Sequence, residues 1–159
     1  MNKKDIVNQF SKEILQDLES ITRAAQSTYD MATHEDNKPE NKYDTRGLEA
    51  SYLAGAQAQR VADMKEVLAI FENLPLRHFD ENTPIGYTAI VEIESNLKRS
   101  FVLLMPKGGG QSTVFNKVQI QVITTESPLG KSLLNKKMGD TFEIENGKMR
   151  REYEIISVV

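Results

Sequence analysis

The chain contains no cysteine among its 159 residues. Without a thiol it forms no disulfide, offers no thiolate to a metal and has no cysteine nucleophile. This absence fits a protein of the reducing cytoplasm, which is where we expect it to act. Tryptophan is also absent, and aromatic residues make up only 7% of the chain. A large ligand pocket lined by aromatic side chains is therefore not expected.

Long apolar runs are missing as well. No stretch approaches the roughly 20 apolar residues that a transmembrane helix needs. The N-terminus, MNKKDIVNQF, lacks the apolar segment and cleavage site of a signal peptide, so we expect no contact with a membrane. The formal net charge is −3, which gives the whole chain no attraction for nucleic acids. Any contact with a polyanion has to be local.

Two long stretches have the periodicity of amphipathic helices, Lys3–Thr33 and Thr45–Leu74. In the first, apolar residues recur every three or four positions; they are Val7, Phe10, Ile14, Leu18, Ile21 and Ala25. The second has a stripe of Leu48, Tyr52, Met64, Val67, Phe71 and Leu74. Two stripes joined by a short polar turn predict an antiparallel α-helical coiled-coil hairpin. The alternative is that both helices fold onto a compact core.

Small residues interrupt the second stripe in the sequence ASYLAGAQA. Ala50, Ala54, Gly55 and Ala58 are expected to let the paired helices approach each other closely. Either Asp44 or Thr45 can cap the start of the second helix, and Pro75 ends it.

The segment between the two helices, residues 34–46, reads HEDNKPENKYDTR. Pro39 disfavours helical geometry at Lys38, and asparagines favour turns, so we expect the tip of a hairpin here. The tip is rich in both charges: Glu35, Asp36, Glu40 and Asp44 alternate with Lys38, Lys42 and Arg46. Charges in a loop are usually only solvated. At the end of a long hairpin, however, carboxylates can be delivered into the cleft of another molecule.

The composition changes after Leu74, which predicts three parts. We expect the helical hairpin in residues 1–75, with its acidic tip at about 34–46, a linker in residues 76–82 and a second domain in residues 83–159. The second domain alternates apolar and polar residues in the manner of strands, at Thr88–Glu94, Arg99–Met105, Val118–Ile123, Thr141–Glu145 and Arg151–Val158. The fold class is therefore α+β.

Two further signals complete the second domain. Ser127–Leu134 reads as a short helix, with Ser127 as its cap and Pro128 at its first position. Asn146-Gly147 is a strong hairpin signal between the last two strands. We therefore expect a small antiparallel sheet with one short helix packed against it.

Motifs of the common catalytic and metal sites are missing. Residues 107–110, KGGG, do not match the phosphate-binding loop, in which the lysine follows the glycines and a helix begins. A loop between strands is expected instead. Neither His34 nor His78 has the neighbours of a metal ligand set. No nucleophile elbow or paired-histidine zinc motif occurs.

Residues 126–156, ESPLGKSLLNKKMGDTFEIENGKMRREYEII, resemble the end of the bacterial Gre (GreA/GreB-like) transcript cleavage factors. That family has an acidic or polar residue, Ser-Pro, a small helix, Gly-Asp and a hairpin ending in an aromatic-Glu-Ile strand. The matching residues are Ser127, Pro128, Leu133, Leu134, Lys137, Gly139, Asp140, Tyr153 and Ile155. The tip DNKPENKY resembles the family's turn Asp-Leu-Lys-Glu-Asn-Ala-Glu-Tyr. It differs by the extra Pro39 and by one residue fewer between Asn41 and Tyr43.

The resemblance implies a coiled-coil arm joined to an FKBP-like globular domain. In Gre factors this domain docks at the rim of the secondary channel of RNA polymerase. The residues that would contact the polymerase here are Glu126, Ser127, Pro128 and Leu129. The arm passes down the channel to the active centre and the 3′ end of a backtracked RNA. The resemblance thus implies RNA polymerase as the partner of a monomeric protein.

The resemblance also implies how the tip would act. Asp36 and Glu40 would help the polymerase cut the transcript by positioning Mg²⁺ and the attacking water, since a two-metal hydrolysis needs both. They would be metal ligands only within the polymerase complex. Lys38, Lys42 and Arg46 could hold RNA phosphates or merely pair with neighbouring acids. The protein would not be an enzyme and would need no cofactor of its own, only the Mg²⁺ of the polymerase.

Two other functions stay open at this point. A factor that occupies the secondary channel without promoting cleavage is favoured by Pro39 and by the altered spacing of the tip. An isomerase or chaperone acting through an FKBP-like domain is disfavoured by the scarcity of aromatic residues, and the fold alone would not imply that activity.

Overall fold

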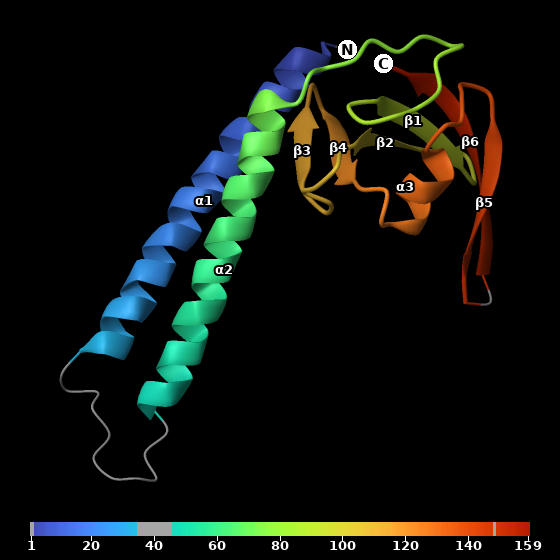
Figure 1. The fold of residues 1–159 in the computed structure, drawn as a ribbon. Helices are drawn as coiled ribbons and strands as arrows, with labels where there is room; N and C mark the ends of the chain where they lie inside the picture. Colours follow the sequence, from blue (N-terminus) through green and yellow to red (C-terminus); the bar gives the residue numbers. More distant parts are fainter. Residues whose placement is uncertain (1, 35–45, 148) are drawn as a thin grey trace. The chain divides into compact units, whose positions relative to one another are not determined.

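The computed structural model of the chain describes residues 2–34, 46–147 and 149–159. Two long helices are followed by a six-stranded sheet and a short third helix (Figure 1). The chain forms two compact units. One is Ser11–Ala69, and the other joins Met1–Phe10 to Ile70–Val159. None of the helices in the described ranges is both long enough and apolar enough to span a bilayer.

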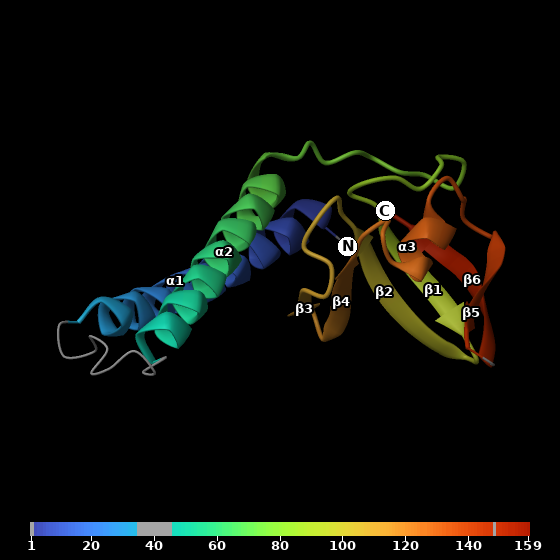
Figure 2. The same ribbon diagram turned by 60° about the horizontal axis from the view of Figure 1, so that its bottom comes forward.

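The two long helices have nearly the predicted bounds. Helix α1 spans Lys3–Thr33 and helix α2 spans Arg46–Asn73. They run antiparallel and side by side in both views (Figures 1 and 2). The predicted second helix, Thr45–Leu74, differs by one residue at each end, and the predicted helical hairpin is confirmed.

The apolar stripe of α1 is where the sequence places it. Val7, Phe10, Ile14 and Leu18 are buried, and Ile21 and Ala25 are half-buried. A helix with apolar residues at steps of three and four presents them on one side, so that a single neighbour can cover them.

The predicted stripe of α2 is wrong at its beginning. Leu48 and Tyr52 are 56% and 72% exposed, whereas Phe71 is buried and Met64 and Val67 are half-buried. The apolar residues of α2 are spread around the helix, while those of α1 gather on one face. A helix with this distribution can bury only part of its apolar side chains against one partner.

Gly55 does not serve a close approach of the two helices, as the sequence had suggested. Apart from its own helix, nothing lies within 4 Å of the place that a Cβ would take. Ala50 and Ala54 are half-buried, but Gly55 and Ala58 are exposed. The small residues of α2 therefore do not form one continuous contact with α1.

Residues 76–82, expected to be a linker, take part in the core. Phe79 is 3% exposed and belongs to the main cluster of buried apolar side chains. The Lys3 ammonium lies 4.6 Å from the centroid of its ring and donates a hydrogen bond to the Arg77 carbonyl at 2.6 Å. Burial, together with the Arg77 guanidinium, lowers the pKa of Lys3 to about 8. The side chain therefore stays largely protonated at neutral pH and can donate this bond.

The sheet follows the order β3-β4-β2-β1-β6-β5. Its strands are β1 (Ile90–Ser95), β2 (Lys98–Leu104), β3 (Ser112–Phe115), β4 (Val118–Ile123), β5 (Thr141–Asn146) and β6 (Met149–Val158). Neighbouring strands pair antiparallel, except that β2 and β4 run parallel. The α+β prediction is confirmed, with this parallel pair as a departure from a fully antiparallel sheet.

Strand β3 was missed by the sequence analysis. It is short, lies at an edge of the sheet and pairs only with β4. The KGGG sequence before it forms the expected loop, in which Gly108 and Gly110 have φ angles of 86° and 93°. Glycine adopts such angles without steric cost, which explains its use where the chain turns from β2 into β3.

The core lies against one face of the sheet. Burial does not alternate strictly along β1 and β2, because the paired residues Ile90 and Leu103, which do not belong to the core cluster, are buried as well. Helix α3, Pro128–Leu133, contributes the fully buried Leu133 to the same cluster. The β5–β6 hairpin pairs Asn146 with Met149, which confirms the hairpin predicted at Asn146-Gly147.

Replacing Phe79 by alanine tests whether residues 76–82 belong to the folded core. The loss of a buried aromatic side chain should cost about 3–5 kcal/mol of unfolding free energy. The control is Leu76→Ala in the same segment, because Leu76 is 38% exposed and should cost less than about 1 kcal/mol. Urea denaturation followed by circular dichroism measures both. Equal, small effects would show that the segment is a linker after all.

Candidate functional site

The structure describes one of the two candidate sites. The docking candidates Glu126, Ser127, Pro128 and Leu129 lie in the turn from β4 into α3, which we call the docking turn (residues 124–130). The tip candidates Asp36, Lys38, Glu40 and Lys42 lie outside the described residues. Arg46 is the first residue of α2, and its side chain is likewise outside them.

Ser127 closes the docking turn from both sides. Its hydroxyl accepts a hydrogen bond from the Gly130 N–H at 3.1 Å and donates one to the Thr124 carbonyl at 2.8 Å. Its extended backbone, with φ −75° and ψ 150°, is that of a helix cap. Pro128 follows at the first helical position, where a missing N–H costs nothing. The predicted cap and first turn are confirmed.

Gly130 allows the turn to close tightly. A Cβ on this residue would lie 2.0 Å from the Thr124 carbonyl oxygen, which is far inside contact distance. The same carbonyl accepts the bond from the Ser127 hydroxyl and one from the Ser127 N–H at 3.0 Å. Thr124, Ser127 and Gly130 therefore form a compact hydrogen-bonded unit that admits no side chain at position 130.

Some side chains of the docking turn contact the core and others are exposed. Leu129 is half-buried against the core cluster, to which Leu133 at the end of α3 also belongs. Glu126 and Pro128 are exposed. A carboxylate and a proline ring are thus presented on a turn whose backbone is fixed by the cap and by the core. Such a surface suits recognition by another protein, because little conformational entropy is lost on binding.

Thr125 extends the turn toward the start of the sheet. Its hydroxyl lies 3.4 Å from that of Tyr87, whose side chain is 39% exposed. The aromatic ring therefore flanks the turn and enlarges the exposed surface around Glu126. The roles of Thr124, Thr125 and Gly130 were not predicted from the sequence, because they depend on backbone positions. The glycine after Ser-Pro was the one available signal.

No group of three or more His, Cys, Asp or Glu side chains in the described part of the chain is arranged to hold a metal ion. His78 is exposed, and Asp80 is engaged locally: its carboxylate accepts hydrogen bonds from the Thr83 hydroxyl at 2.6 Å and the Asn82 N–H at 3.0 Å. These bonds lower the pKa of Asp80.

Residues 85–159 match the family model described as transcription elongation factor, GreA/GreB, C-terminal. Two curated relatives are named transcription inhibitor protein Gfh1, and they come from two strains of Thermus thermophilus. They are 25% and 24% identical over 117 residues, which cover 73% of this chain and 72% of each relative.

Solved structures of similar proteins include GreA factor homolog 1 (Gfh1) of Thermus thermophilus and a GreA/GreB factor of Nitrosomonas europaea. The first is 22% identical and covers 94% of both chains, with a TM-score of 0.37. The second is 19% identical and covers 60% of this chain and 78% of its own, with a TM-score of 0.39.

The family match includes the whole of the sheet, α3 and the docking turn. It also includes the Ser-Pro, Gly-Asp and hairpin residues that first suggested the resemblance. Residues 85–159 are therefore similar to the C-terminal domain of the GreA/GreB transcription elongation factors.

Proposed function

We propose that the protein is a transcription factor that binds RNA polymerase at the rim of its secondary channel through the docking turn. Members of the family bind RNA polymerase. The observation that carries the proposal is the family match over residues 85–159, within which Ser127 and Gly130 hold Glu126 and Pro128 in a fixed, exposed turn. In this function the sheet domain binds, and the helical hairpin reaches the polymerase active centre.

The further step in the proposal is that the tip stimulates cleavage of backtracked RNA. Hydrolysis of a phosphodiester at a two-metal site needs an activated water and two bound cations. Asp36 and Glu40 supply the carboxylates, because Mg²⁺ in such sites takes one or two of them and keeps several waters. Family factors of this kind are not enzymes themselves; the polymerase supplies the remaining ligands and the reacting RNA.

A second candidate is a factor that occupies the channel without promoting cleavage. Two observations favour it. The curated relatives are named transcription inhibitor proteins, and the tip sequence has Pro39 inserted before Glu40. A shift of one residue in a turn can move a carboxylate out of reach of a metal, because ligand distances are tolerated only within a few tenths of an ångström.

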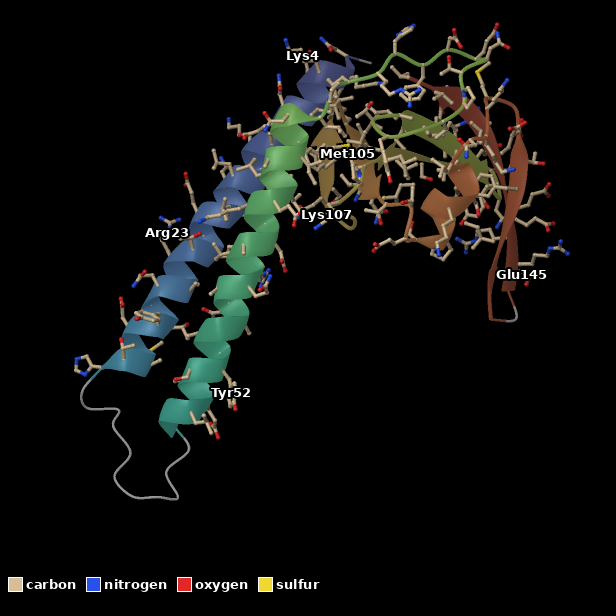
Figure 3. All side chains as sticks on the ribbon, in the orientation of Figure 1. Lys4, Arg23, Tyr52, Met105, Lys107 and Glu145 are labelled. Atoms are coloured by element: carbon tan, nitrogen blue, oxygen red, sulfur yellow. The ribbon has the colours of Figure 1, made fainter. Side chains whose placement is uncertain are left out.

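Reversing the charge of Glu126 tests the docking turn. Glu126→Arg should weaken binding to the cognate RNA polymerase by about tenfold, since a like charge at an interface repels the partner. The melting temperature should not change, because the side chain is exposed. The matched control is Glu145→Arg, another exposed glutamate, on β5 (Figure 3). If both variants bind as the wild type does, the polymerase contacts a different surface.

Neutralising the two tip acids separates the two candidate functions. The double variant Asp36→Asn/Glu40→Gln should lose stimulated cleavage on stalled, backtracked elongation complexes while still binding polymerase, because binding is assigned to the sheet domain. A higher Mg²⁺ concentration should partly restore either single variant, if the carboxylate recruits the metal.

Glu35→Gln is run beside the double variant because, with Pro39 inserted, Glu35 is the alternative to Asp36 as the first tip acid. A wild type that binds tightly and never stimulates cleavage identifies the non-cleaving factor. A double variant that cleaves as well as the wild type shows that these two acids are ordinary solvated charges.

A further inference from the structure

A groove of ≈ 710 Å³ opens on the face of the sheet that α3 covers only in part. Its apolar floor includes Ile93 of β1 and Val102 of β2, which also belong to the core. Leu129, the second residue of α3, forms one side. The groove is therefore the part of the core-facing surface that the six-residue helix does not reach.

Strand pairing brings basic residues together at one end of this groove. In the parallel pair, Phe101 lies opposite Ile120, so the start of β2, with Lys98, and the start of β4, which follows Lys117, lie at the same end of the sheet. In the antiparallel pair of β1 and β6, Glu94 lies opposite Glu154. That register brings Arg151 alongside the turn that ends β1. Three cations distant in sequence thus meet at one end of the sheet.

The lining of the groove has a single sign of charge. It contains Lys98, Arg99, Lys117 and Arg151 and no carboxylate. Arg99 is engaged by Glu92 at 3.1 Å and by Glu94 at 2.9 Å, which raises its pKa. For the other three, no carboxylate partner is found in the parts of the chain that the structure describes. In a protein with a net charge of −3, this is a local surplus of positive charge without an internal counterion.

An apolar side chain stands beside these cations. Leu97 is 93% exposed and has a φ angle of 60°. With Asn96 it makes the two-residue turn between β1 and β2, and the residues on both sides of it line the groove. A leucine is disfavoured by this backbone angle, at which asparagine or glycine is common, and it gains nothing from burial. Local stability therefore does not account for leucine at position 97.

One aromatic side chain in the lining of the groove is held in place by a stacked neighbour. Tyr153 lines the groove, and its ring stacks on the buried Phe142 with centroids 5.3 Å apart and an angle of 11°. One face of the tyrosine ring is therefore occupied. Proteins that bind single-stranded nucleic acid offer ring faces on which bases stack. An exposed leucine next to three cations is complementary to a peptide that carries carboxylates and an apolar side chain.

We propose that this basic groove, which is lined by Lys98, Lys117, Arg151 and Tyr153 and flanked by Leu97, binds an acidic peptide segment of a protein partner. Carboxylates of the segment pair with the three cations, and an apolar side chain of the segment packs on Leu97. Leu129 joins the groove to the docking turn, so the same partner spans both surfaces. That last assignment rests on the proposed function; peptide binding by the groove does not.

The test measures binding of a short fluorescent peptide, in which leucines are set among glutamates, to the full-length protein by fluorescence anisotropy. The wild type should bind it, and binding should weaken with added salt, as expected for charge pairing. The double variant Lys98→Glu/Lys117→Glu should bind at least about tenfold more weakly. The control, Lys4→Glu/Lys137→Glu, changes the net charge equally at exposed lysines outside the groove and should bind like the wild type.

Leu97→Asn separates a binding role from a structural one. Asparagine tolerates the positive φ angle better than leucine, so the melting temperature should stay the same or rise. Peptide binding should nevertheless fall severalfold. A gain in stability with unchanged binding would remove Leu97 from the proposed surface and overturn its part of the proposal.

Three results would show that the groove is not a peptide site. The first is that the wild type does not bind the peptide, and the second is that the two double variants lose binding equally. The third is that a short oligo-uridine binds the same residues more tightly than the peptide. Glu126→Arg should keep full peptide binding, because it lies outside the groove. If the wild type failed to bind polymerase, the proposed function would be disproved. Whether the groove binds an acidic peptide would still be decided by the peptide assay alone.

Discussion

Helix α3 has only six residues and cannot cover one face of a six-stranded sheet. Which part of that face is covered and which stays exposed depends on this limit. The helix can lie close to the sheet because Gly130 lets the backbone approach the Thr124 carbonyl, where a Cβ would collide at 2.0 Å. Leu133 then fills the core, and Phe79, from a segment before the first strand, covers a further part of it. What stays uncovered becomes the basic groove. The docking turn and the groove are thus two results of one packing arrangement, and Leu129 belongs to both.

Within the helical hairpin, the side chains near Thr33 and Arg46 are less buried than those at the opposite ends of the two helices. The stripe of α1 is buried from Ile6 to Leu18, whereas Tyr29 and Met31 are more than half exposed, as is Tyr52 near the start of α2 (Figure 3). Helices of this length depend on tertiary packing for most of their stability. The helix ends next to the tip are therefore held by fewer buried contacts than the opposite ends, where Phe10 meets Phe71 with ring centroids 5.6 Å apart.

The sequence predicted those features that depend on local pattern. The bounds of α1, the cap at Ser127, the β5–β6 hairpin and five of the strands follow from periodicity and turn chemistry, which act over a few residues. The predictions from the sequence were wrong or missing where a structure depends on residues far apart in the chain. Strand β3 exists only because β4 pairs with it, and Phe79 is buried by strands that follow it. Leu48 and Tyr52 fitted a stripe by spacing, but α2 does not concentrate its apolar residues on one face. At the docking turn, Ser127 was predictable as a cap, whereas Gly130 required the position of the Thr124 carbonyl.

The docking turn and the basic groove, two neighbouring surfaces of the sheet domain, carry opposite charges. Glu126 is exposed on the docking turn, and Lys98, Lys117 and Arg151 line the groove that begins at Leu129. A surface with an acidic part and a basic part favours one binding orientation of its partner. A partner with the complementary charges is attracted in that orientation and repelled in the reverse one. Such pairs add less to affinity than to selectivity, because exposed charges remain hydrated and are screened by salt. Under the proposed function, these two surfaces would therefore set the orientation in which the sheet domain meets the polymerase more than they would set the affinity.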